Sequence, residues 1–386
     1  MNILIIGLDY TLAMPTSEVM GDSQKRHIMY AKHVKSLHIA VQCLKKLNLR
    51  NQKLAENLFI YPTNSSSRIK AVYDSYRIAN RICKDHKMDL ITTQDPFTCG
   101  LVGYLLKRKY NFPLNIQMHS DIFDNKYWLR ERKYNRLFNF IGKRLICKAD
   151  MLKVGTSREK EKLTQKWGIE PDRIYLLPVV VDINKFINPS DENIREQFKA
   201  KGFEKIVLFV GRLVYQKDLS TLLKAAKIVI DNQPKTFFMI VGNGKEKDSL
   251  EAISRSLGIS DNVLFTGEIA RDEVPKYFHS CDIFALSSVY EGTCRVLVEA
   301  AASGKPIVTT NIAGADDIVI SGKTGFVVEP KDFKQLAEKI VYLLKHPEVA
   351  EKMGRAGFEH ITEVFDEKKM VDGLMKMWEE TARCKV

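Results

Sequence analysis

The sequence predicts an α/β protein of two domains, each built around a largely parallel sheet. The chain has 386 residues, which is more than one ordinary hydrophobic core holds. Short apolar segments alternate with longer amphipathic ones, which is the pattern of parallel strands joined by helices. This pattern restarts after a polar stretch at residues 180–203, which therefore marks the seam between two doubly wound halves.

Each short apolar segment is an expected strand. The first half contains seven, at residues 2–7, 37–41, 58–61, 89–93, 114–119, 151–155 and 174–178. The second half contains six, at residues 205–211, 237–242, 262–267, 282–287, 306–310 and 325–329. The final segment, 367–382, predicts a helix because Met370, Leu374 and Trp378 share one side. The predicted first domain is 1–190 with 366–386, and the second is 191–365.

The composition excludes several protein classes. No apolar run approaches the roughly 18–20 residues of a membrane span, and the N-terminus lacks a signal-peptide pattern. The seven cysteines are scattered without a C-x-x-C pair, which argues against a zinc site and a disulfide framework. The chain contains no D-x-D motif. We therefore expect a cytoplasmic protein with no metal and no cofactor.

The net charge of +13 is unevenly placed. Residues 1–190 hold 32 Lys and Arg against 17 Asp and Glu, whereas residues 191–386 hold 28 against 30. The first half should therefore meet an anionic partner. Basic and aromatic residues mix in the run 126–166, which favours an anionic membrane surface, and no nucleic-acid motif occurs. The alternative is a helix with solvated charges that packs its apolar residues inward, namely Leu129, Leu137, Phe140 and Ile141.

Parallel α/β sheets bind ligands outside the carboxyl ends of their strands, so the loops that follow strands are candidate sites. The stretch G-R-L-V-Y-Q-K-D (211–218) follows the strand at 205–211. Gly211 permits a tight turn there. Arg212 and Lys217 are two cations that could clamp a diphosphate. The alternative is an arginine–carboxylate pair beside an exposed lysine.

Two glycines follow the next strand, in V-G-N-G-K-E-K-D (241–248). Gly242 and Gly244 suit a close approach of the backbone to a ligand. A dinucleotide fingerprint is absent because Lys247 stands where its third glycine belongs, and Asp317 stands where a Walker A loop needs its first glycine.

The stretch Y-E-G-T-C-R-V-L-V-E-A (290–300) carries two glutamates. A helix starting near Gly292–Thr293 would offer N–H groups and its dipole to an anion, with Glu291 before it and Glu299 about two turns inside. The glutamates would lie about 12 Å apart, whereas a glycosidase pair needs about 5–9.5 Å. We interpret them as two residues that bind the two ends of one extended ligand, with its phosphates between them. The alternative is a buried helix with a glutamate at each end.

Two further positions lie in the first half. The stretch M-H-S-D places His119 and Asp121 after a strand, where they would meet the reacting group, although a structural histidine is the alternative. Gly21 opens the first long helix and could approach a phosphate, whereas Asp22 could be a plain N-cap.

Taken together, these loops resemble the retaining glycosyltransferases of family 4, also called group 1 glycosyltransferases. The resemblance is strongest over 205–330, in G-R-L-V-Y-Q-K-D, V-G-N-G, F-T-G-E-I, E-x7-E, A-S-G-K-P-I-V and S-G-K-T-G-F-V-V-E-P. It is looser in the first half, in D-P-F, M-H-S-D, A-D-M-L-K-V-G-T-S and L-P-V-V-V-D-I-N-K-F. It implies the GT-B fold, two Rossmann-like domains facing across a cleft.

The resemblance also implies roles. Arg212 and Lys217 would stabilise a leaving diphosphate, Glu291 would hold sugar hydroxyls, and Glu299 would bind a ribose diol. His119 would touch the donor sugar. The chain reads E-G-T-C where the family often reads E-G-F-G, and it keeps one glycine where the first-helix loop often has two. The other expected substrate-binding positions are Gly21, Asp121, Gly211, Gly242, Gly244, Glu268, Ile269, Gly292, Thr293 and Cys294.

The resulting prediction is a retaining, metal-independent transferase that uses a UDP- or GDP-sugar. Its acceptor would be a glycan or a lipid-linked acceptor of cell-surface polysaccharide or glycolipid synthesis, met on the inner face of the membrane. Nucleic acid is not an expected partner. A sugar-nucleotide epimerase or a phosphorylase of the same fold is the first alternative. A basic nucleic-acid-binding or membrane-binding protein without catalysis is the second.

Overall fold

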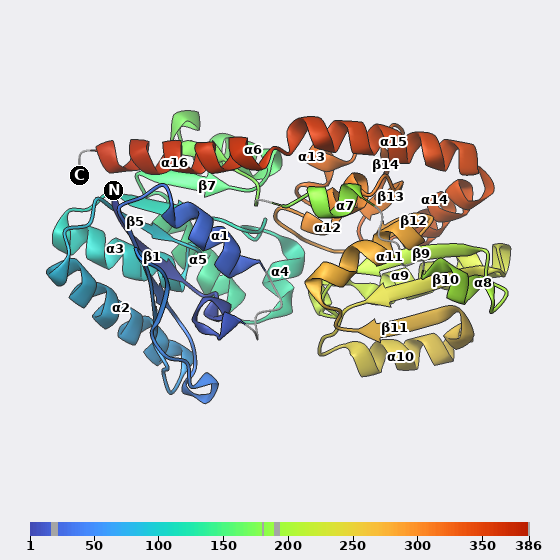
Figure 1. Cartoon of the computed structure of the whole chain (residues 1–386), viewed down its shortest axis with the longest axis horizontal. Coiled ribbons are helices and arrows are strands. Elements are labelled where there is room, and N and C mark those ends of the chain that lie inside the picture. The colour runs from blue at the N-terminus through green and yellow to red at the C-terminus, as the bar shows by residue number, and fades with distance from the viewer. Residues whose placement is uncertain (17–21, 180, 189–193, 385–386) are drawn as a thin grey trace. The chain divides into compact units, whose positions relative to one another are not determined.

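The structure is a computed structural model of the 386-residue chain, and it describes residues 1–16, 22–179, 181–188 and 194–384 (Figure 1). The expected domain boundary at residues 190 and 191 lies outside the described residues. None of the described helices is long and apolar enough to span a membrane.

The chain divides into two compact units. The first comprises Met1–Asp124, Arg132–Val180 and Lys368–Val386, and the second comprises Asn125–Glu131 and Val181–Glu367. The short segment Asn125–Glu131 therefore groups with the second unit, although it lies within the range expected for the first. In the second unit the Tyr290 hydroxyl donates a hydrogen bond to the Glu131 carboxylate, which holds this segment there.

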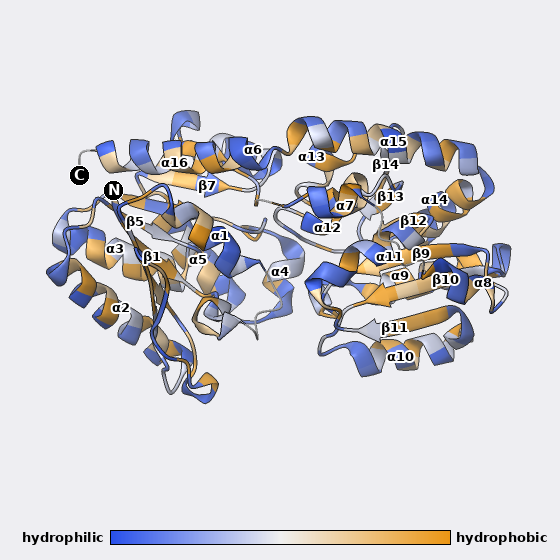
Figure 2. Cartoon of the chain, viewed as in Figure 1, coloured by the Kyte–Doolittle hydropathy of each residue, from blue (hydrophilic) through white to orange (hydrophobic). Residues whose placement is uncertain are grey.

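The first unit is built on an eight-stranded sheet in the order β3-β4-β2-β1-β5-β6-β7-β8. Every strand pair is parallel except β3 with β4. The strands are apolar because both faces of the sheet are covered by helices (Figure 2). Their bounds are β1 Asn2–Gly7, β2 Ser36–Val41, β3 Gln52–Ala55, β4 Leu58–Pro62, β5 Leu90–Thr93, β6 Leu114–Gln117, β7 Met151–Val154 and β8 Ile174–Leu176.

Two core clusters lie on the two faces of this sheet. The buried sides of α2, α3 and α5 pack into one cluster. The last helix, α16, packs into the other through Leu374, Met377 and Trp378. Thr156 caps α6 at its start, and Gly168 ends it in the left-handed conformation. The helices are α1 Ser23–Ala31, α2 Arg68–Asp85, α3 Thr98–Tyr110, α5 Asn135–Ile146, α6 Ser157–Trp167 and α16 Glu367–Arg383.

The second unit is built on a six-stranded parallel sheet in the order β11-β10-β9-β12-β13-β14. Its strands are β9 Lys205–Val210, β10 Thr236–Val241, β11 Val263–Gly267, β12 Ile283–Leu286, β13 Ile307–Thr310 and β14 Gly325–Val328. Its helices are α4 Lys126–Glu131, α7 Asn184–Ile187, α8 Arg195–Lys199, α9 Leu219–Asn232, α10 Lys247–Ser256, α11 Val274–Ser280, α12 Arg295–Ala302, α13 Ala315–Ile318, α14 Phe333–Lys345 and α15 Pro347–Val364.

The predicted α/β class with two largely parallel sheets is confirmed, and each predicted strand has its counterpart. Strand β3 was not predicted from the sequence. This strand begins with two polar residues, Gln52 and Lys53, and pairs antiparallel at the edge of the sheet, so it lacks the apolar run of a buried parallel strand. In the second sheet β9 and β12 are neighbours, so the loops that follow them leave the sheet side by side.

Candidate functional site

The candidate site of the second unit begins at the loop Gly211–Asp218, which follows β9 and contains the short 3-10 helix η5 Tyr215–Lys217. The loop that follows β12 holds it in place. The Ser287 hydroxyl donates hydrogen bonds to the carbonyls of Lys217 and Asp218, at 2.9 and 3.0 Å. The amide of Val289 donates to the Gln216 carbonyl at 2.9 Å. Two separate strand ends are therefore joined into one rigid surface.

Lys217 and Glu291 form a buried ion pair within this surface. The Nζ of Lys217 lies 2.5 Å from Oε1 of Glu291. The Ser288 hydroxyl donates to the same oxygen at 2.8 Å, and Nε2 of Gln216 donates to Oε2 at 3.1 Å. Burial by itself lowers the pKa of Lys217, but the Glu291 carboxylate outweighs it and leaves the pKa raised. The lysine is therefore cationic at neutral pH.

Arg212 differs from Lys217 in its surroundings. It is exposed, and no residue in the described part of the chain hydrogen-bonds to its guanidinium or pairs with it. The structure thus reverses the alternative considered from sequence, in which the arginine was paired and the lysine was exposed. One cation of this loop is fixed inside the protein, and the other is available at the surface.

Asp218 joins a third loop to the site. Its backbone is left-handed, with φ +45°, and its side chain is buried. Its carboxylate accepts hydrogen bonds from the hydroxyls of Ser220 and Thr221, at 3.0 and 2.6 Å. It also accepts one from Nζ of Lys331 at 2.8 Å, and Lys331 belongs to the loop that follows β14. This carboxylate therefore stabilises a turn that a non-glycine residue rarely adopts.

The glycines after β10 have a packing role that sequence did not reveal. A Cβ atom at Gly242 would lie 2.0 Å from the carbonyl oxygen of Gly211. A Cβ atom at Gly244 would lie 2.3 Å from the carbonyl oxygen of Leu213. The backbone that approaches these glycines most closely is therefore that of the neighbouring loop. The sequence had predicted a close approach to a ligand instead. The contact fixes the position of Gly211 beside Arg212.

The loop that follows β12 is longer than predicted and extends to Cys294. Helix α12 begins at Arg295 with Cys294 as its N-cap, so the expected start near Gly292–Thr293 is wrong. Gly292 and Cys294 are buried, and Thr293 is half-buried. Burial and the charge of Glu291 raise the pKa of the Cys294 thiol well above its usual range, so it is not a nucleophile at neutral pH.

Glu299 lies about one turn inside α12, not the two turns expected, and it is completely buried. Arg271 forms an ion pair with its Oε1. Its Oε2 is buried and has no hydrogen-bond partner among the described residues. Since a buried unpaired carboxylate oxygen is unfavourable, this atom is poised to accept a hydrogen bond.

Arg271 is a site residue that sequence reasoning missed. It opens the 3-10 helix η7 Arg271–Glu273, directly after the loop with the expected substrate-binding residues Glu268 and Ile269. Within that loop Glu268 is exposed and Ile269 is half-buried. Arg271 thus connects the end of β11 with α12, a pairing that no local pattern in the sequence indicates.

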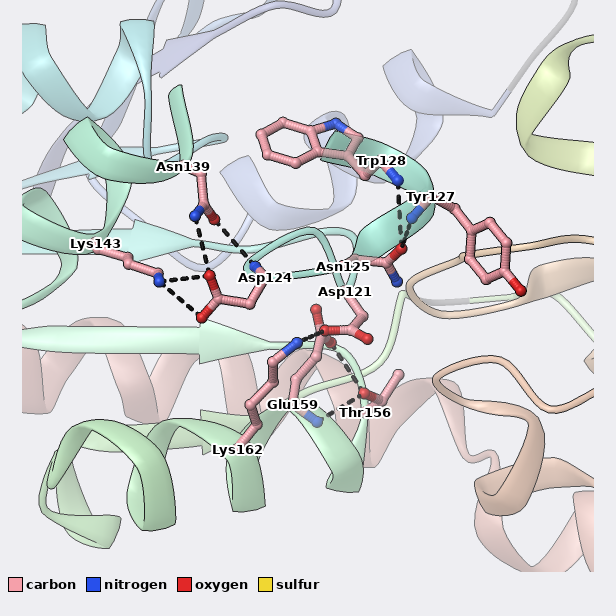
Figure 3. Close-up of polar contacts among 10 residues, drawn as sticks. All are labelled: Asp121, Asp124, Asn125, Tyr127, Trp128, Asn139, Lys143, Thr156, Glu159 and Lys162. Atoms are coloured by element: carbon pink, nitrogen blue, oxygen red, sulfur yellow. Dashed lines mark hydrogen bonds and ion pairs between the residues drawn. The ribbon is translucent and has the colours of Figure 1, made fainter. Parts of the chain in front are cut away.

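In the first unit, His119 and Asp121 follow β6 as predicted. Nζ of Lys162 lies 2.7 Å from the carboxylate of Asp121, and the carboxyl group of Glu159 points toward the same carboxylate (Figure 3). His119 is exposed in the loop that follows β6. Desolvation by the nearby protein lowers the pKa of His119, and the positive charge of Lys153 lowers it further, so the imidazole is uncharged at neutral pH.

Glu159 and Lys153 are buried groups that the sequence analysis did not select. Oε2 of Glu159 accepts hydrogen bonds from the Gly155 amide and the Thr156 hydroxyl, at 3.1 and 3.0 Å, while Oε1 has no partner among the described residues. Burial raises the pKa of Glu159 to about 8, and the nearby Asp121 carboxylate adds to the rise. Burial lowers the pKa of Lys153 to about 8, although Glu159 opposes this.

The expected residues thus fall into two sets. Arg212, Lys217, Glu291 and their neighbours belong to the second unit, and His119 with Asp121 belongs to the first. Gly21 lies outside the described residues. Within the described ranges, no group of three or more His, Cys, Asp or Glu side chains is arranged to hold a metal ion.

Comparison with known proteins adds two family matches. The model for Glycosyl transferases group 1 matches residues 190–360, which contain the loops described above. The model for Glycosyltransferase Family 4 matches residues 38–185. Together these matches span most of both units.

Two curated relatives are similar in sequence. The chain is 28% identical over 315 residues to an uncharacterised glycosyltransferase of Methanocaldococcus jannaschii, and the alignment covers 81% of each chain. It is 27% identical over 258 residues to mannosylfructose-phosphate synthase of Agrobacterium fabrum, which covers 64% of this chain and 55% of that protein. This chain therefore spans little more than half of the second relative.

Solved structures share the fold. Sucrose-phosphate synthase from Thermosynechococcus elongatus superimposes with a TM-score of 0.84 at 20% identity, covering 98% of this chain and 99% of that one. HepE of Anabaena, solved with UDP and glucose, superimposes with a TM-score of 0.76 at 20% identity, covering 98% and 100%. Both neighbours are GT-B glycosyltransferases, so the predicted GT-B fold class is confirmed.

Proposed function

The chain belongs to the group 1 glycosyltransferases of family 4, and on that premise we propose its reaction in more detail. It moves a sugar from a UDP- or GDP-sugar to a glycan or a lipid-linked acceptor. The configuration at the anomeric carbon is retained, and no metal ion takes part. The acceptor belongs to cell-surface polysaccharide or glycolipid synthesis.

The observation that supports this proposal best is the arrangement of Lys217, Glu291 and Arg212. Departure of a nucleoside diphosphate places negative charge on its phosphates, and the site must stabilise that charge. The ion pair with Glu291 fixes the Lys217 ammonium, and the guanidinium of Arg212, on the same loop, has no partner in the part of the chain that the structure describes. One fixed cation and one exposed cation on the same loop would together supply what a divalent metal supplies in other transferases.

Glu291 has a second part in the proposed reaction. Its two oxygens accept hydrogen bonds from Ser288 and Gln216 as well as from Lys217, so its orientation is fixed. We assign its remaining acceptor capacity to donor-sugar hydroxyls. Because this carboxylate is engaged by a lysine, it is poorly suited to attack the anomeric carbon. Retention then requires a front-face substitution, in which the leaving phosphate helps to deprotonate the acceptor.

Glu299 is assigned to the ribose. Its Oε2 is buried without a partner among the described residues, and a ribose diol supplies the donor hydroxyls that such an oxygen lacks. Because Arg271 occupies Oε1, one oxygen remains for the ligand. The loop with Glu268 and Ile269 precedes Arg271, and we assign it to the nucleobase.

The acceptor is assigned to the first unit. HepE was solved with UDP and glucose, which supports a nucleotide-sugar donor for this fold without naming an acceptor. The first half carries the positive charge of the chain, and a lipid-linked acceptor on the anionic inner face of the cell membrane matches that charge. His119 and Asp121 would then contact the sugar and the acceptor.

A thermal-shift panel of UDP, GDP, ADP and their sugars tests the donor assignment. A ligand at 100 times its Kd should stabilise the protein by roughly 2.7 kcal/mol. Arg212→Ala should reduce the shift given by diphosphates, whereas Lys227→Ala should not, because Lys227 pairs with Asp231 on an exposed helix face. Absence of a shift with every nucleotide would contradict the proposal.

Product analysis by NMR then separates the activities of this fold. Transfer releases the nucleoside diphosphate and forms a glycoside with the anomeric configuration of the donor. An epimerase would instead alter the sugar, and a phosphorylase would form a sugar 1-phosphate. Inverted product, or loss of turnover in EDTA, would overturn the retaining and metal-independent parts of the proposal.

A further inference from the structure

Three helices of the first unit form one layer. Helix α3 packs between α2 and α5, and the three lie on the same face of the sheet (Figure 1). Their buried sides all enter one core cluster, through Ala79 and Ile82 of α2, Val102 of α3 and Leu145 of α5. The opposite sides of all three helices therefore point away from the sheet. We call these outward sides the three-helix face.

Large apolar side chains lie exposed on each of the three helices. On α2, Ile69 is 87% exposed and Tyr73 is 60% exposed. On α3, Leu105 is 41% exposed. On α5, Leu137 is 58% exposed and Phe140 is 54% exposed, so the inward packing considered for these two residues from sequence is wrong. A single exposed apolar residue is ordinary, but five on neighbouring helices mark an interaction surface.

The same helices are strongly basic. The segments of α2, α3 and α5 hold eleven Lys and Arg residues and two acidic residues, Asp74 and Asp85, which gives a net charge of +9. Lys107 and Lys143 pair with Asp150 and Asp124 outside these helices, and counting these two acids leaves +7. Some of these cations lie against the exposed rings. The Arg144 guanidinium is 3.4 Å from the centre of the Phe140 ring, and the Arg77 guanidinium is 5.9 Å from that of Tyr73. Apolar and cationic groups are thus interleaved on one surface.

We propose that the three-helix face binds the surface of an anionic lipid bilayer. Interleaved cations and apolar side chains match a layer of anionic headgroups above hydrocarbon. A nucleic acid would match the cations but would leave Ile69 and Leu137 without a role, because its backbone offers no apolar partner to an aliphatic side chain. No described helix can span a bilayer, so the association is peripheral.

The role of this membrane binding rests on the proposed function, since binding would bring the enzyme to a lipid-linked acceptor. The surface itself lies entirely within the first unit. Arg212, Lys217 and Glu291 belong to the second unit, so membrane binding and nucleotide binding can be measured as separate properties. Failure of one would not imply failure of the other.

The test is co-flotation of the 386-residue chain with vesicles. Vesicles of phosphatidylcholine alone are compared with vesicles that contain about one third phosphatidylglycerol. The protein should float with the anionic vesicles only, and binding should fall when added salt shortens the screening length. Each lysine or arginine removed from the face should lower the partition coefficient about fivefold. Arg136→Ala with Arg144→Ala should therefore lower it about 25-fold.

Matched variants separate the face from general loss of charge. Lys368 and Lys376 are exposed on α16, which packs on the other face of the same sheet, and their replacement by alanine should leave flotation nearly unchanged. Leu137→Ser with Phe140→Ser should lower anionic-vesicle binding about tenfold at unchanged charge. UDP thermal shifts of all variants should equal those of the natural protein.

Three results would overturn the inference. The first is a natural protein that does not float with anionic vesicles. The second is an equal loss of flotation when Lys368 and Lys376 are replaced. The third is retention of single-stranded DNA that competes with vesicles and survives Leu137→Ser with Phe140→Ser, because it would identify the face as a nucleic-acid surface. If flotation fails while UDP still stabilises the protein, this inference falls and the proposed reaction stands.

Discussion

The buried pair of Lys217 and Glu291 should be worth several kilocalories per mole to the second unit. The side chain of Lys217 is 11% exposed and that of Glu291 is 10% exposed. Replacing Glu291 by Gln removes the anion and leaves the Lys217 ammonium enclosed. Removing one member of a buried pair typically costs about 3–5 kcal/mol, because the remaining charge is uncompensated. For a domain of this size each kilocalorie shifts the melting temperature by about 2–4 °C. Glu291→Gln should therefore lower it by about 6–20 °C.

Lys217→Met should be milder. Glu291 would keep the hydrogen bonds from Ser288 and Gln216, which satisfy part of its carboxylate. The double variant, Lys217→Met with Glu291→Gln, removes both charges and should recover much of the loss. A double-mutant cycle by urea unfolding measures the coupling, which we expect to exceed about 2 kcal/mol. A coupling below about 0.5 kcal/mol would refute the reasoning that the pair is electrostatically linked.

The pH dependence supplies an independent check. The pKa of Lys217 is raised in the folded protein, with burial acting downward and the Glu291 carboxylate acting upward. A raised pKa means that the folded protein holds the proton more tightly than the unfolded chain. The stabilisation is then complete below the ordinary lysine pKa of about 10.4 and is lost as the pH rises through the folded value. The coupling should therefore be constant at neutral pH and fall only in strong alkali.

Three further predictions concern single residues. Arg212→Ala should lower turnover by about 10²–10³ with an unchanged melting temperature, because Arg212 is exposed and has no partner among the described residues; steady-state kinetics and a melting curve check this. Glu299→Gln should weaken UDP binding by about 10–100-fold in calorimetry, because a neutral oxygen accepts ribose hydrogen bonds more weakly than a carboxylate. Glu159→Gln should stabilise the protein at neutral pH. Because the pKa of Glu159 is raised to about 8 in the folded protein, the natural protein loses stability as the pH rises from the ordinary pKa of a glutamate to about 8. Urea unfolding midpoints at pH 4 and 8 should therefore show a gain in stability at pH 8 only.

The parallel strands were predictable because their signal is local. A buried parallel strand has both faces covered, so nearly all of its residues are apolar, as in Ile3, Leu4, Ile5 and Ile6 of β1. The loops at the carboxyl ends of such strands could then be located from sequence. The antiparallel strand β3 was not predicted because a short edge strand has no continuous run of apolar residues.

The surroundings of each site residue were not predictable in the same way. Whether Arg212 or Lys217 is the paired cation depends on Ser288 and Glu291, which lie about seventy residues along the chain. The start of α12 was misplaced because Gly292, Thr293 and Cys294 fit the cap and the first turn of a helix equally well, and Cys294 is the cap. The ion pair of Arg271 with Glu299 joins the segment after β11 to the helix after β12, and no spacing in the sequence predicts it.

In the proposed reaction, these long-range contacts would let the site act without a metal. Ser287 fixes the carbonyls of Lys217 and Asp218, and Lys331 fixes the Asp218 carboxylate, so the loops after three strands are joined by hydrogen bonds. A ligand therefore need not order them on binding. Immobilising a long side chain costs about 0.5–1.5 kcal/mol, and Arg212 is the cation of the Gly211–Asp218 loop for which that cost remains. In the proposed reaction, the fixed cation would stabilise developing charge without reorganisation, and the exposed one would follow the diphosphate as it departs.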